Sequence, residues 1–173
     1  DVQRLLAQMR EARVDWAVLE ATSHGLALHR LDECAFDVGV VTNITHEHLE
    51  FHGTIEEYRR AKARLLERVA SRGSRPYPGG VVLNRDDEGA RAIAGAAGTA
   101  PVLWFSSTGA PADLRADDVR VAADGTSFRL TTPSGSVPVR LNLIGAYNVD
   151  NALAAAGVGH LLGLSLDAIA RGL

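Results

Sequence analysis

The sequence predicts an α/β fold in which a mostly parallel sheet is flanked by helices. Up to residue 106, helical and strand patterns alternate, and this alternation is typical of a parallel sheet. The strand-like runs are almost continuously apolar, as expected for strands that are covered on both faces. Between about residues 107 and 143 the composition shifts to Gly, Pro, Ser and Thr with short alternating runs, which predicts a small antiparallel β-hairpin subdomain.

Apolar periodicity and capping residues place the individual elements. The predicted order is a helix at 2–12, strands at 14–21 and 36–43, a helix at 54–71, a strand at 79–84, a helix at 87–97 and a strand at 102–106. Asp124-Gly125 and Ser134-Gly135 mark the turns of the antiparallel hairpins. An alanine-rich helix follows at 148–162, and a last helix begins near Ser165.

The composition is that of a globular chain with one domain-sized core, since 46% of its 173 residues are hydrophobic and 23% are charged. A net charge of -3 provides no basic field for nucleic acid, and no apolar run reaches the roughly 20 residues of a membrane span. The single cysteine, Cys34, cannot form an internal disulfide, which favours a reducing compartment. We therefore expect a cytoplasmic monomer with no nucleic-acid or membrane partner.

Both ends of the sequence lie inside helical patterns. The chain begins at Asp1 within the pattern of 2–12, and it ends at Leu173 in a helix whose apolar face has no predicted partner. We therefore expect the chain to be a fragment of a longer protein.

One lysine stands where a helix pattern requires an apolar residue. Thr54 and Glu57 form a capping box that starts the predicted helix at 54–71. Its apolar stripe consists of Ile55, Tyr58, Leu65, Leu66 and Val69. Lys62 falls in the middle of this stripe. The lysine can extend along the apolar face and place its ammonium group at the edge. Alternatively, desolvation keeps the amine neutral, and carbon dioxide converts it to a carboxylate that supports a metal ion.

Histidines gather at the predicted carboxyl ends of the two early strands. Five of the six histidines are in this group: His24, His29, His46, His48 and His52. Glu20, Glu47 and Glu50 are close in sequence, and imidazole with carboxylate suits several divalent metals. The spacing His46-x-His48-x-x-x-His52 alone is compatible with zinc, but it lacks cysteine ligands and the HExxH arrangement. Any single histidine is more often a hydrogen-bonded or surface residue, so the clustering is what predicts a site.

Other polar residues have two interpretations each. Asn148 and Asn151 share one helical face, and Asn148 is either a simple N-cap or one half of a pair that faces a ligand. Thr22 and Ser23 end a predicted strand as turn hydroxyls or as ligand contacts, and Arg30 is a surface residue or a ligand contact.

Three segments resemble, in the same order, motifs of the Mur ligase family. They are LEATSHGLALHR at 19–30, FDVGVVTNITHEHLEFHGTIEEYRRAKARLL at 36–66 and GAYNVDNALAAA at 145–156. The block HLEFHG followed by YRRAK is most similar to the members that add the third amino acid to UDP-N-acetylmuramoyl-L-alanyl-D-glutamate. The resemblance implies that residues 1–173 form part of the central, P-loop NTPase-like domain of a cytoplasmic, ATP-dependent amide-bond ligase of peptidoglycan synthesis.

The resemblance also implies a role for particular residues. The magnesium site would involve Glu20, His48 and Lys62, with His48 and a carbamylated Lys62 taking part in catalysis. The UDP-muramoyl dipeptide would contact Thr22, Ser23 and Arg30. The adenine of ATP would lie against Asn148 and Asn151. In this family the γ-phosphate passes to the D-glutamate carboxylate, and the amine of a diamino acid attacks the resulting acyl phosphate.

The sequence departs from the family pattern in several places. No G-x-x-x-x-G-K-[ST] phosphate loop occurs in the chain, and by resemblance that loop lies before Asp1. The domain that selects the third amino acid is also missing, which leaves diaminopimelate and lysine open. Leu28 stands where close relatives carry a substrate-binding glutamine, and Glu47 replaces an aspartate. We expect the chain alone to be inactive.

Two other functions fit parts of the pattern. A metal-dependent hydrolase can use a histidine cluster and a carboxylated lysine to hold two metals and activate water. A ligase-like domain without a phosphate loop can instead be retained as a non-catalytic interaction module.

Overall fold

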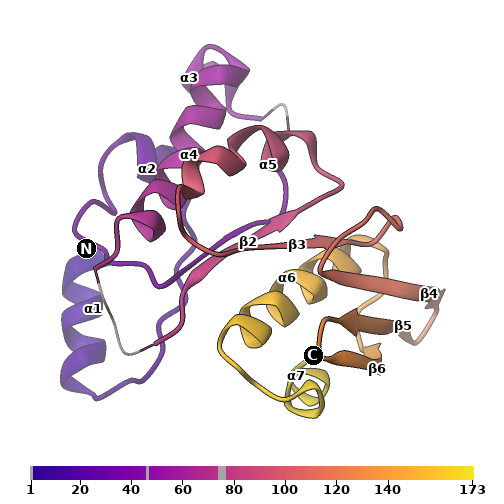
Figure 1. Cartoon of the computed structure of the whole chain (residues 1–173). Helices are drawn as coiled ribbons and strands as arrows, with labels where there is room; N and C mark the ends of the chain where they lie inside the picture. The colour runs from indigo at the N-terminus through magenta and orange to yellow at the C-terminus, as the bar shows by residue number, and fades with distance from the viewer. Residues whose placement is uncertain (1, 46, 74–76) are drawn as a thin grey trace.

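The computed structural model describes residues 2–45, 47–73 and 77–173, which form a six-stranded sheet in the order β1-β2-β3-β4-β5-β6 (Figure 1). The first four strands run parallel, and they are β1 (Val38–Val41), β2 (Gly80–Asn84), β3 (Val102–Ser106) and β4 (Leu114–Ala122). The last two strands pair antiparallel, and they are β5 (Gly125–Thr132) and β6 (Gly135–Leu141). This mixed sheet confirms the predicted fold class, and β4 to β6 lie within the predicted 107–143 segment.

Helices cover both faces of the sheet (Figure 1). One layer contains α2 (Ser23–Ala27), α3 (Leu49–His52), α4 (Ile55–Ala70), α5 (Glu88–Ile93) and the 3-10 helix η1 (Ala94–Ala97). The other layer contains α6 (Tyr147–Leu161) and α7 (Leu166–Gly172). Helix α1 (Val2–Glu11) lies beside the first layer and contributes partly buried side chains to its core. None of the helices in the described ranges is long and apolar enough to cross a membrane.

Strand β2, which lies between β1 and β3, separates two hydrophobic cores. Val81 and Leu83 pack in the core beneath α4, whereas Val82 packs in the core beneath α6, and all three are 0% exposed. Side chains alternate across a strand, so a continuously apolar strand supplies both layers. The run GVVLN was therefore a reliable signal of a strand covered on both sides.

The predicted strand at 14–21 is wrong. This segment connects α1 to α2 without joining the sheet, and no backbone-to-backbone hydrogen bond links residues 15–21 to another described residue. Val14, Trp16 and Val18 are exposed by 50%, 59% and 96%. Strand-forming residues become a strand only where a neighbouring strand pairs with them, and β1 pairs with β2 alone among the described strands.

Other predicted boundaries shift by smaller amounts. The helix expected at 87–97 divides into α5 and η1, and the strand expected at 36–43 shortens to β1. The short helix α3 was not predicted. Element ends are the least certain part of any assignment from pattern, because fraying and tertiary contacts decide them.

Two helix-capping residues, Thr54 and Asp87, fix the starts of α4 and α5. Thr54 accepts a hydrogen bond from the Glu57 backbone N–H at 3.2 Å, which confirms the predicted start of α4. Asp87 caps α5 by accepting from the Ala90 N–H at 2.6 Å. The same Asp87 oxygen accepts from the Ile44 N–H at 3.1 Å. One carboxylate therefore holds the loop after β1 against the start of α5.

Gly89 allows that loop and α5 to approach closely. A methyl group at Gly89 would lie 2.4 Å from Ile44 Cβ and 2.6 Å from the Ile44 carbonyl oxygen. We expect Gly89→Ala to lower the free energy of unfolding by about 1 to 3 kcal/mol, because the backbone of Ile44 would have to move. Urea unfolding measures this cost. The matched control is Gly95→Ala, where no described atom lies within 4 Å, and equal midpoints for the two variants would contradict the prediction.

Candidate active site

A band of polar groups runs along the carboxyl ends of the parallel strands. The Asn84 side-chain amide donates to the Thr42 carbonyl at 2.9 Å, which connects the end of β2 to the end of β1. The Asp86 N–H donates to the Asn84 side-chain oxygen at 2.9 Å. Ligands of open α/β sheets bind at this edge, where the strands end and the loops begin.

Asp86 fastens the loop after β3. Its carboxylate accepts from the Ser106 hydroxyl at 2.8 Å and the Thr108 hydroxyl at 2.7 Å. It also accepts from the backbone N–H groups of Ser107 at 2.9 Å and Thr108 at 3.2 Å. Burial opposes ionisation, but the hydrogen bonds from Thr108, Ser106 and the backbone outweigh it and lower the pKa of Asp86. Asp86 therefore carries a stable negative charge at this edge.

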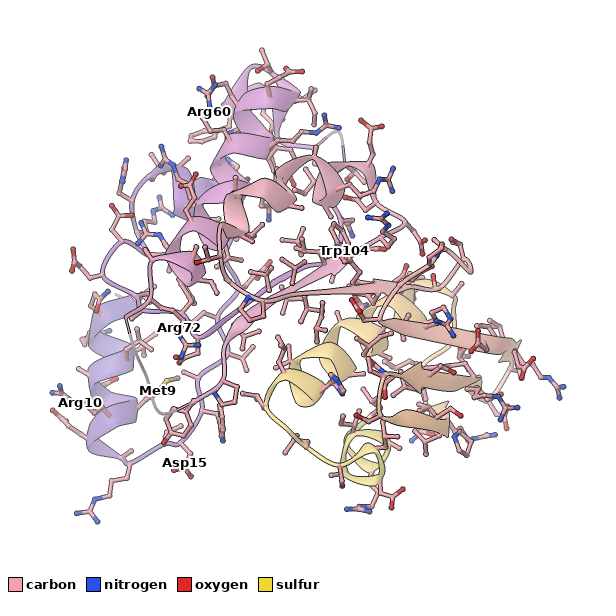
Figure 2. The ribbon with its side chains drawn as sticks, in the orientation of Figure 1. Met9, Arg10, Asp15, Arg60, Arg72 and Trp104 are labelled. Carbon is pink, nitrogen blue, oxygen red and sulfur yellow. The ribbon has the colours of Figure 1, made fainter. Side chains whose placement is uncertain are left out.

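The side chain of Lys62 is half-buried on α4, at the same edge of the fold. Its ammonium donates to the Ala21 carbonyl at 3.4 Å, a long and weak hydrogen bond. Burial lowers the pKa of Lys62, while the charges of Glu20 and Glu47 oppose that shift. Arg60, two residues earlier on α4, instead points into solvent (Figure 2). The structure thus places a poorly paired amine in the vicinity of two carboxylates.

Tyr58 lies one helical turn before Lys62 and is only 4% exposed. Its pKa is raised by burial and then by the charges of Glu47 and Asp87. Glu47 thus acts electrostatically on both Tyr58 and Lys62. The loop after β1 therefore brings an acidic group against the first two turns of α4.

Three of the predicted histidines form an aromatic cluster next to Tyr58. The His24 ring centroid lies 5.0 Å from that of His48 and 5.6 Å from that of His52. His24 also stacks on Phe51 at 4.1 Å. Burial lowers the pKa of His52, and the neighbouring His24 and His48 lower it further. This packing favours the neutral imidazole of His52.

The other two histidines of the sequence group are not in this cluster. His29 is an exposed partner of Asp32, with 2.7 Å between His29 Nδ1 and an Asp32 carboxylate oxygen. His46 lies outside the described residues.

His48 has an uncommon backbone conformation. Its φ angle is +58°, in the left-handed region, and it precedes the single turn of α3. Its side chain is 46% exposed and its Nδ1 atom lies 3.7 Å from a Glu50 carboxylate oxygen. Such local strain is often found at functional sites.

The oxygen donors near Lys62 are compatible with magnesium. Within the described ranges, no three His, Cys, Asp or Glu side chains lie close enough together to hold a metal ion. The zinc interpretation of the histidine spacing stays untested, because His46 lies outside those ranges. Magnesium needs only one or two protein carboxylates, because it keeps several water ligands and often binds substrate phosphates. The oxygen donors of Glu20 and Glu47, with the adjacent Lys62 amine, fit that requirement.

The predicted substrate contacts have different accessibilities. Thr22 caps α2, where its hydroxyl accepts from the Gly25 N–H at 3.0 Å. Ser23 is 2% exposed and its hydroxyl has no hydrogen-bond partner among the described residues. Arg30 is exposed in the turn after α2. Of the three, Arg30 and Thr22 are exposed and can contact a ligand. Ser23 is buried because it starts α2, which packs on α4.

The two asparagines of α6 also differ from each other. Asn148 is 9% exposed, and its side-chain amide donates to the Ile144 carbonyl at 3.1 Å. The N-cap is Ala146, so the interpretation of Asn148 as a helix cap is wrong. Asn148 instead fixes the loop that precedes the helix. Asn151 is exposed, so it is the member of the pair that can contact a ligand.

Sequence reasoning missed the residues that join the two helical layers at this edge. Asp86 and Ser107 follow β2 and β3, and Asp150 lies in the first turn of α6 near both. A signal was present, because the sequence Asn84-Arg85-Asp86-Asp87 places polar residues directly after a buried strand. The ends of β2 and β3 therefore lie beside the first turn of α6.

One hollow among the described residues lies elsewhere. It has a volume of about 450 Å³ and is lined by His29, Asp32, Arg64, Glu67, Arg68 and Ser71. Its cations are already engaged, because Arg64 donates to the Leu26 and Ala27 carbonyls and Arg68 pairs with Asp32. The polar edge, with its poorly paired amine, is therefore the better candidate site.

An open, mostly parallel sheet with polar groups gathered at its carboxyl edge defines the class of α/β domains that bind ligands at that edge. The family described as Mur ligase middle domain matches residues 1–159. The chain belongs to the Mur ligase family.

Curated relatives extend this result. The chain is 46% identical over 173 residues to the UDP-N-acetylmuramyl-tripeptide synthetase of Roseiflexus sp. (strain RS-1), covering 96% of the chain and 34% of that protein. It is 37% identical over 172 residues to the UDP-N-acetylmuramoyl-L-alanyl-D-glutamate--2,6-diaminopimelate ligase of Bacillus velezensis, covering 99% of the chain and 35% of that protein. The chain thus spans about a third of the length of these relatives.

Solved structures agree with this assignment. A UDP-N-acetylmuramoyl-L-alanyl-D-glutamate--2,6-diaminopimelate ligase superimposes with a TM-score of 0.77 and 34% identity, covering 88% of this chain and 31% of that one. The apo form of L. casei FPGS superimposes with a TM-score of 0.76 at 20% identity, covering 96% of this chain and 40% of that one. The second similarity shows the fold alone.

Lys62→Met tests whether the buried ammonium group of Lys62 destabilises the folded protein. Burial holds the pKa of Lys62 in the folded chain below its ordinary value of 10.5. At pH values between the folded-state pKa and the ordinary pKa, the unfolded chain binds more protons than the folded chain, so the free energy of unfolding rises with pH in that range. We expect Lys62→Met to be more stable than the wild type near neutral pH, with the difference narrowing toward about pH 10. Urea unfolding in buffer free of carbon dioxide measures this, with Arg60→Met as the exposed control. A difference that does not vary with pH would contradict the prediction.

Proposed function

We propose that this chain is the central part of an ATP-dependent ligase that adds the third amino acid to UDP-N-acetylmuramoyl-L-alanyl-D-glutamate. The main support is the half-buried Lys62 amine, which lies near Glu20 and Glu47 at the sheet edge of a Mur ligase fold. The names of the relatives support the same substrate, because they are a tripeptide synthetase and a diaminopimelate ligase of that UDP-muramoyl dipeptide. We also propose a cytoplasmic monomer.

Lys62 would act as a carbamate. Its neutral amine, which burial favours, attacks carbon dioxide, and a C–N bond forms while one C=O electron pair moves to oxygen. The amine proton passes to water, so a cation is replaced by an anion. Glu20, His48 and this carbamate would then hold Mg²⁺ at the edge. The bound ion would neutralise charge on the phosphates of ATP.

The remaining residues would bind and orient the two substrates. Asn151 is exposed at the start of α6 and would contact the adenine, while Asn148 fixes the loop beside it. Thr22 and Arg30 would contact the UDP-muramoyl dipeptide, and the buried position of Ser23 suits support of Thr22 rather than direct contact. The D-glutamate carboxylate attacks the γ-phosphorus and ADP leaves. The amine of a diamino acid then attacks the acyl phosphate, and phosphate leaves as the amide forms.

The chain alone does not contain every group that this reaction needs. It carries no G-x-x-x-x-G-K-[ST] loop to bind the ATP phosphates. The relatives that it matches are about three times as long. Recognition of the third amino acid, whether diaminopimelate or lysine, is therefore assigned to a segment beyond this chain.

Phosphate release tests the proposed reaction. The assay supplies ATP, magnesium, UDP-N-acetylmuramoyl-L-alanyl-D-glutamate and either diaminopimelate or lysine, and it compares this chain with the protein extended at both ends to the full gene. We expect release only from the extended protein and only with the dipeptide substrate. Release with one diamino acid would identify the third residue. Absence of release from the extended protein would refute the proposal.

Lys62→Ala in the extended protein tests the carbamate. We expect activity to fall by about 10- to 100-fold or more, because a group that supports the metal site is lost. A short carboxylic acid such as acetate should restore part of the activity by supplying the missing carboxylate. Arg60→Ala, on the exposed side of the same helix, is the control and should retain activity. An unchanged rate for Lys62→Ala would contradict the assigned role.

The alternative of a metal-dependent hydrolase is less well supported. That chemistry needs a group of convergent ligands for two metals, and the described residues contain no such group of three.

A further inference from the structure

The turn after α2 has the hydrogen bonds of a Schellman motif, and Arg30 is its last residue. The Arg30 backbone N–H donates to the Gly25 carbonyl at 2.9 Å, and the His29 N–H donates to the Leu26 carbonyl at 3.4 Å. His29 has a φ angle of +59°, the left-handed conformation that this motif needs just after the helix C-cap. The motif therefore sets the direction in which the chain leaves α2 at Arg30.

This turn needs support from outside α2. Helix α2 has only five residues, too few to be stable without tertiary contacts. Glycine is the usual residue at the left-handed position of a Schellman motif, and a residue with a Cβ atom such as His29 is strained there. The geometry of the turn therefore depends on contacts from another element.

Two arginines of α4 supply such contacts. Arg64 Nη1 donates to the Leu26 carbonyl at 2.9 Å and to the Ala27 carbonyl at 3.2 Å, and these are the last two carbonyls of α2. Arg68 donates through Nη1 to the Asp32 carbonyl and through Nη2 to the Asp32 carboxylate. Helix α4 therefore holds the chain both before and after the turn.

The two arginines are not solvated surface charges. Arg64 is only partly exposed, and the side chain of Arg68 is 20% exposed. Removing a guanidinium group from water is unfavourable, and the hydrogen bonds to carbonyl and carboxylate oxygens offset this. Asp32 also contacts His29, because His29 Nδ1 lies 2.7 Å from an Asp32 carboxylate oxygen. Asp32 thus connects the strained residue of the turn to α4.

Arg30 differs from both arginines of α4. It is exposed, and within the described ranges no hydrogen bond or ion pair engages its guanidinium group. A guanidinium group with a fixed position binds a carboxylate well, because its planar donors match the two carboxylate oxygens. The proposed UDP-muramoyl dipeptide brings D-glutamate carboxylates. An unpaired arginine on a fastened turn is therefore suited to that substrate.

We propose that Arg64 and Arg68 are positioning residues, which fasten the turn after α2 to α4 and so hold Arg30 in place for the UDP-muramoyl dipeptide. This inference rests on the proposed function, which assigns Arg30 to that substrate. The proposed nucleotide contact, Asn151, belongs to α6 on the other face of the sheet. Loss of either brace should therefore weaken binding of the dipeptide and leave binding of ATP unchanged.

Methionine and lysine variants separate the hydrogen bonds from the packing. Arg64→Met and Arg68→Met keep an apolar stem and remove the donors, whereas Arg64→Lys and Arg68→Lys keep one cationic donor group. The matched control is Arg60→Met, because Arg60 is an exposed arginine of α4 whose ion-pair partner, Glu57, lies on the same helix.

Hydrogen exchange of this chain, followed by NMR, tests the bracing without any substrate. The readout is the Arg30 amide, whose hydrogen bond to the Gly25 carbonyl closes the turn. We expect each methionine variant to speed exchange of this amide by about 10-fold or more, while the amides of β2 keep wild-type protection. The lysine variants should recover part of the protection, and Arg60→Met should behave as the wild type. Unchanged protection of the Arg30 amide in both methionine variants would overturn the inference.

Steady-state kinetics of the gene-extended protein test the positioning role. We expect Arg64→Met and Arg68→Met to raise KM for the UDP-muramoyl dipeptide by about 5- to 20-fold and to keep KM for ATP within about twofold of the wild type. Arg30→Met should raise KM for the dipeptide as well. Arg64→Met combined with Arg30→Met should cause little further increase, because both changes act through one guanidinium group. The lysine variants should restore part of the affinity for the dipeptide.

The outcomes separate the bracing from the proposed function. If Arg64→Met and Arg30→Met have additive effects, or if KM rises equally for the dipeptide and for ATP, then Arg64 is only structural and the inference is overturned while the proposed function stands. If the wild-type extended protein shows no turnover with the dipeptide, the proposed function fails, and the substrate role of Arg30 fails with it. Hydrogen exchange then still decides whether α4 holds the turn.

Discussion

The burial of β2 between two helical layers is the constraint on which the rest of the structure depends. Its side chains alternate between the core under α4 and the core under α6, and the whole strand is buried. Removing this much apolar surface from water is the main favourable contribution that such a short strand can make. The strand therefore fixes the distance between the layers, and its carboxyl end, at Asn84 and Asp86, becomes the point from which the polar edge is organised.

The candidate site uses both layers without lying in either core. Lys62 belongs to α4 and Asn151 belongs to α6, on opposite faces of the sheet. Parallel strands end on the same side of a sheet, and Asp86 holds the loop after β3 beside the start of α6.

Several features could be predicted because they depend on near neighbours in sequence. The position of Lys62 in an apolar stripe follows from helical periodicity, and its half-buried amine agrees with that pattern. Thr54 caps α4 because its hydroxyl and the Glu57 N–H are brought together by any helix that starts there. The segment at 14–21 shows where prediction from local sequence fails. Its residues favour a strand, but a strand also needs a partner strand from another part of the chain to pair with.

The sequence alone determined the fold class, the family and the clustering of chemical groups after the first strands, because periodicity, capping and motif order are local properties. Tertiary structure decided which of those groups are accessible. It encloses Ser23 and turns Asn148 toward Ile144, and it leaves Asn151 exposed. It also brings Asp150 close enough to Asp86, sixty-odd residues away in the chain, for the charge of one to act on the other, a proximity that no local pattern encodes. The physical reason is that burial and charge proximity depend on which elements pack together, and packing is a property of the whole sheet.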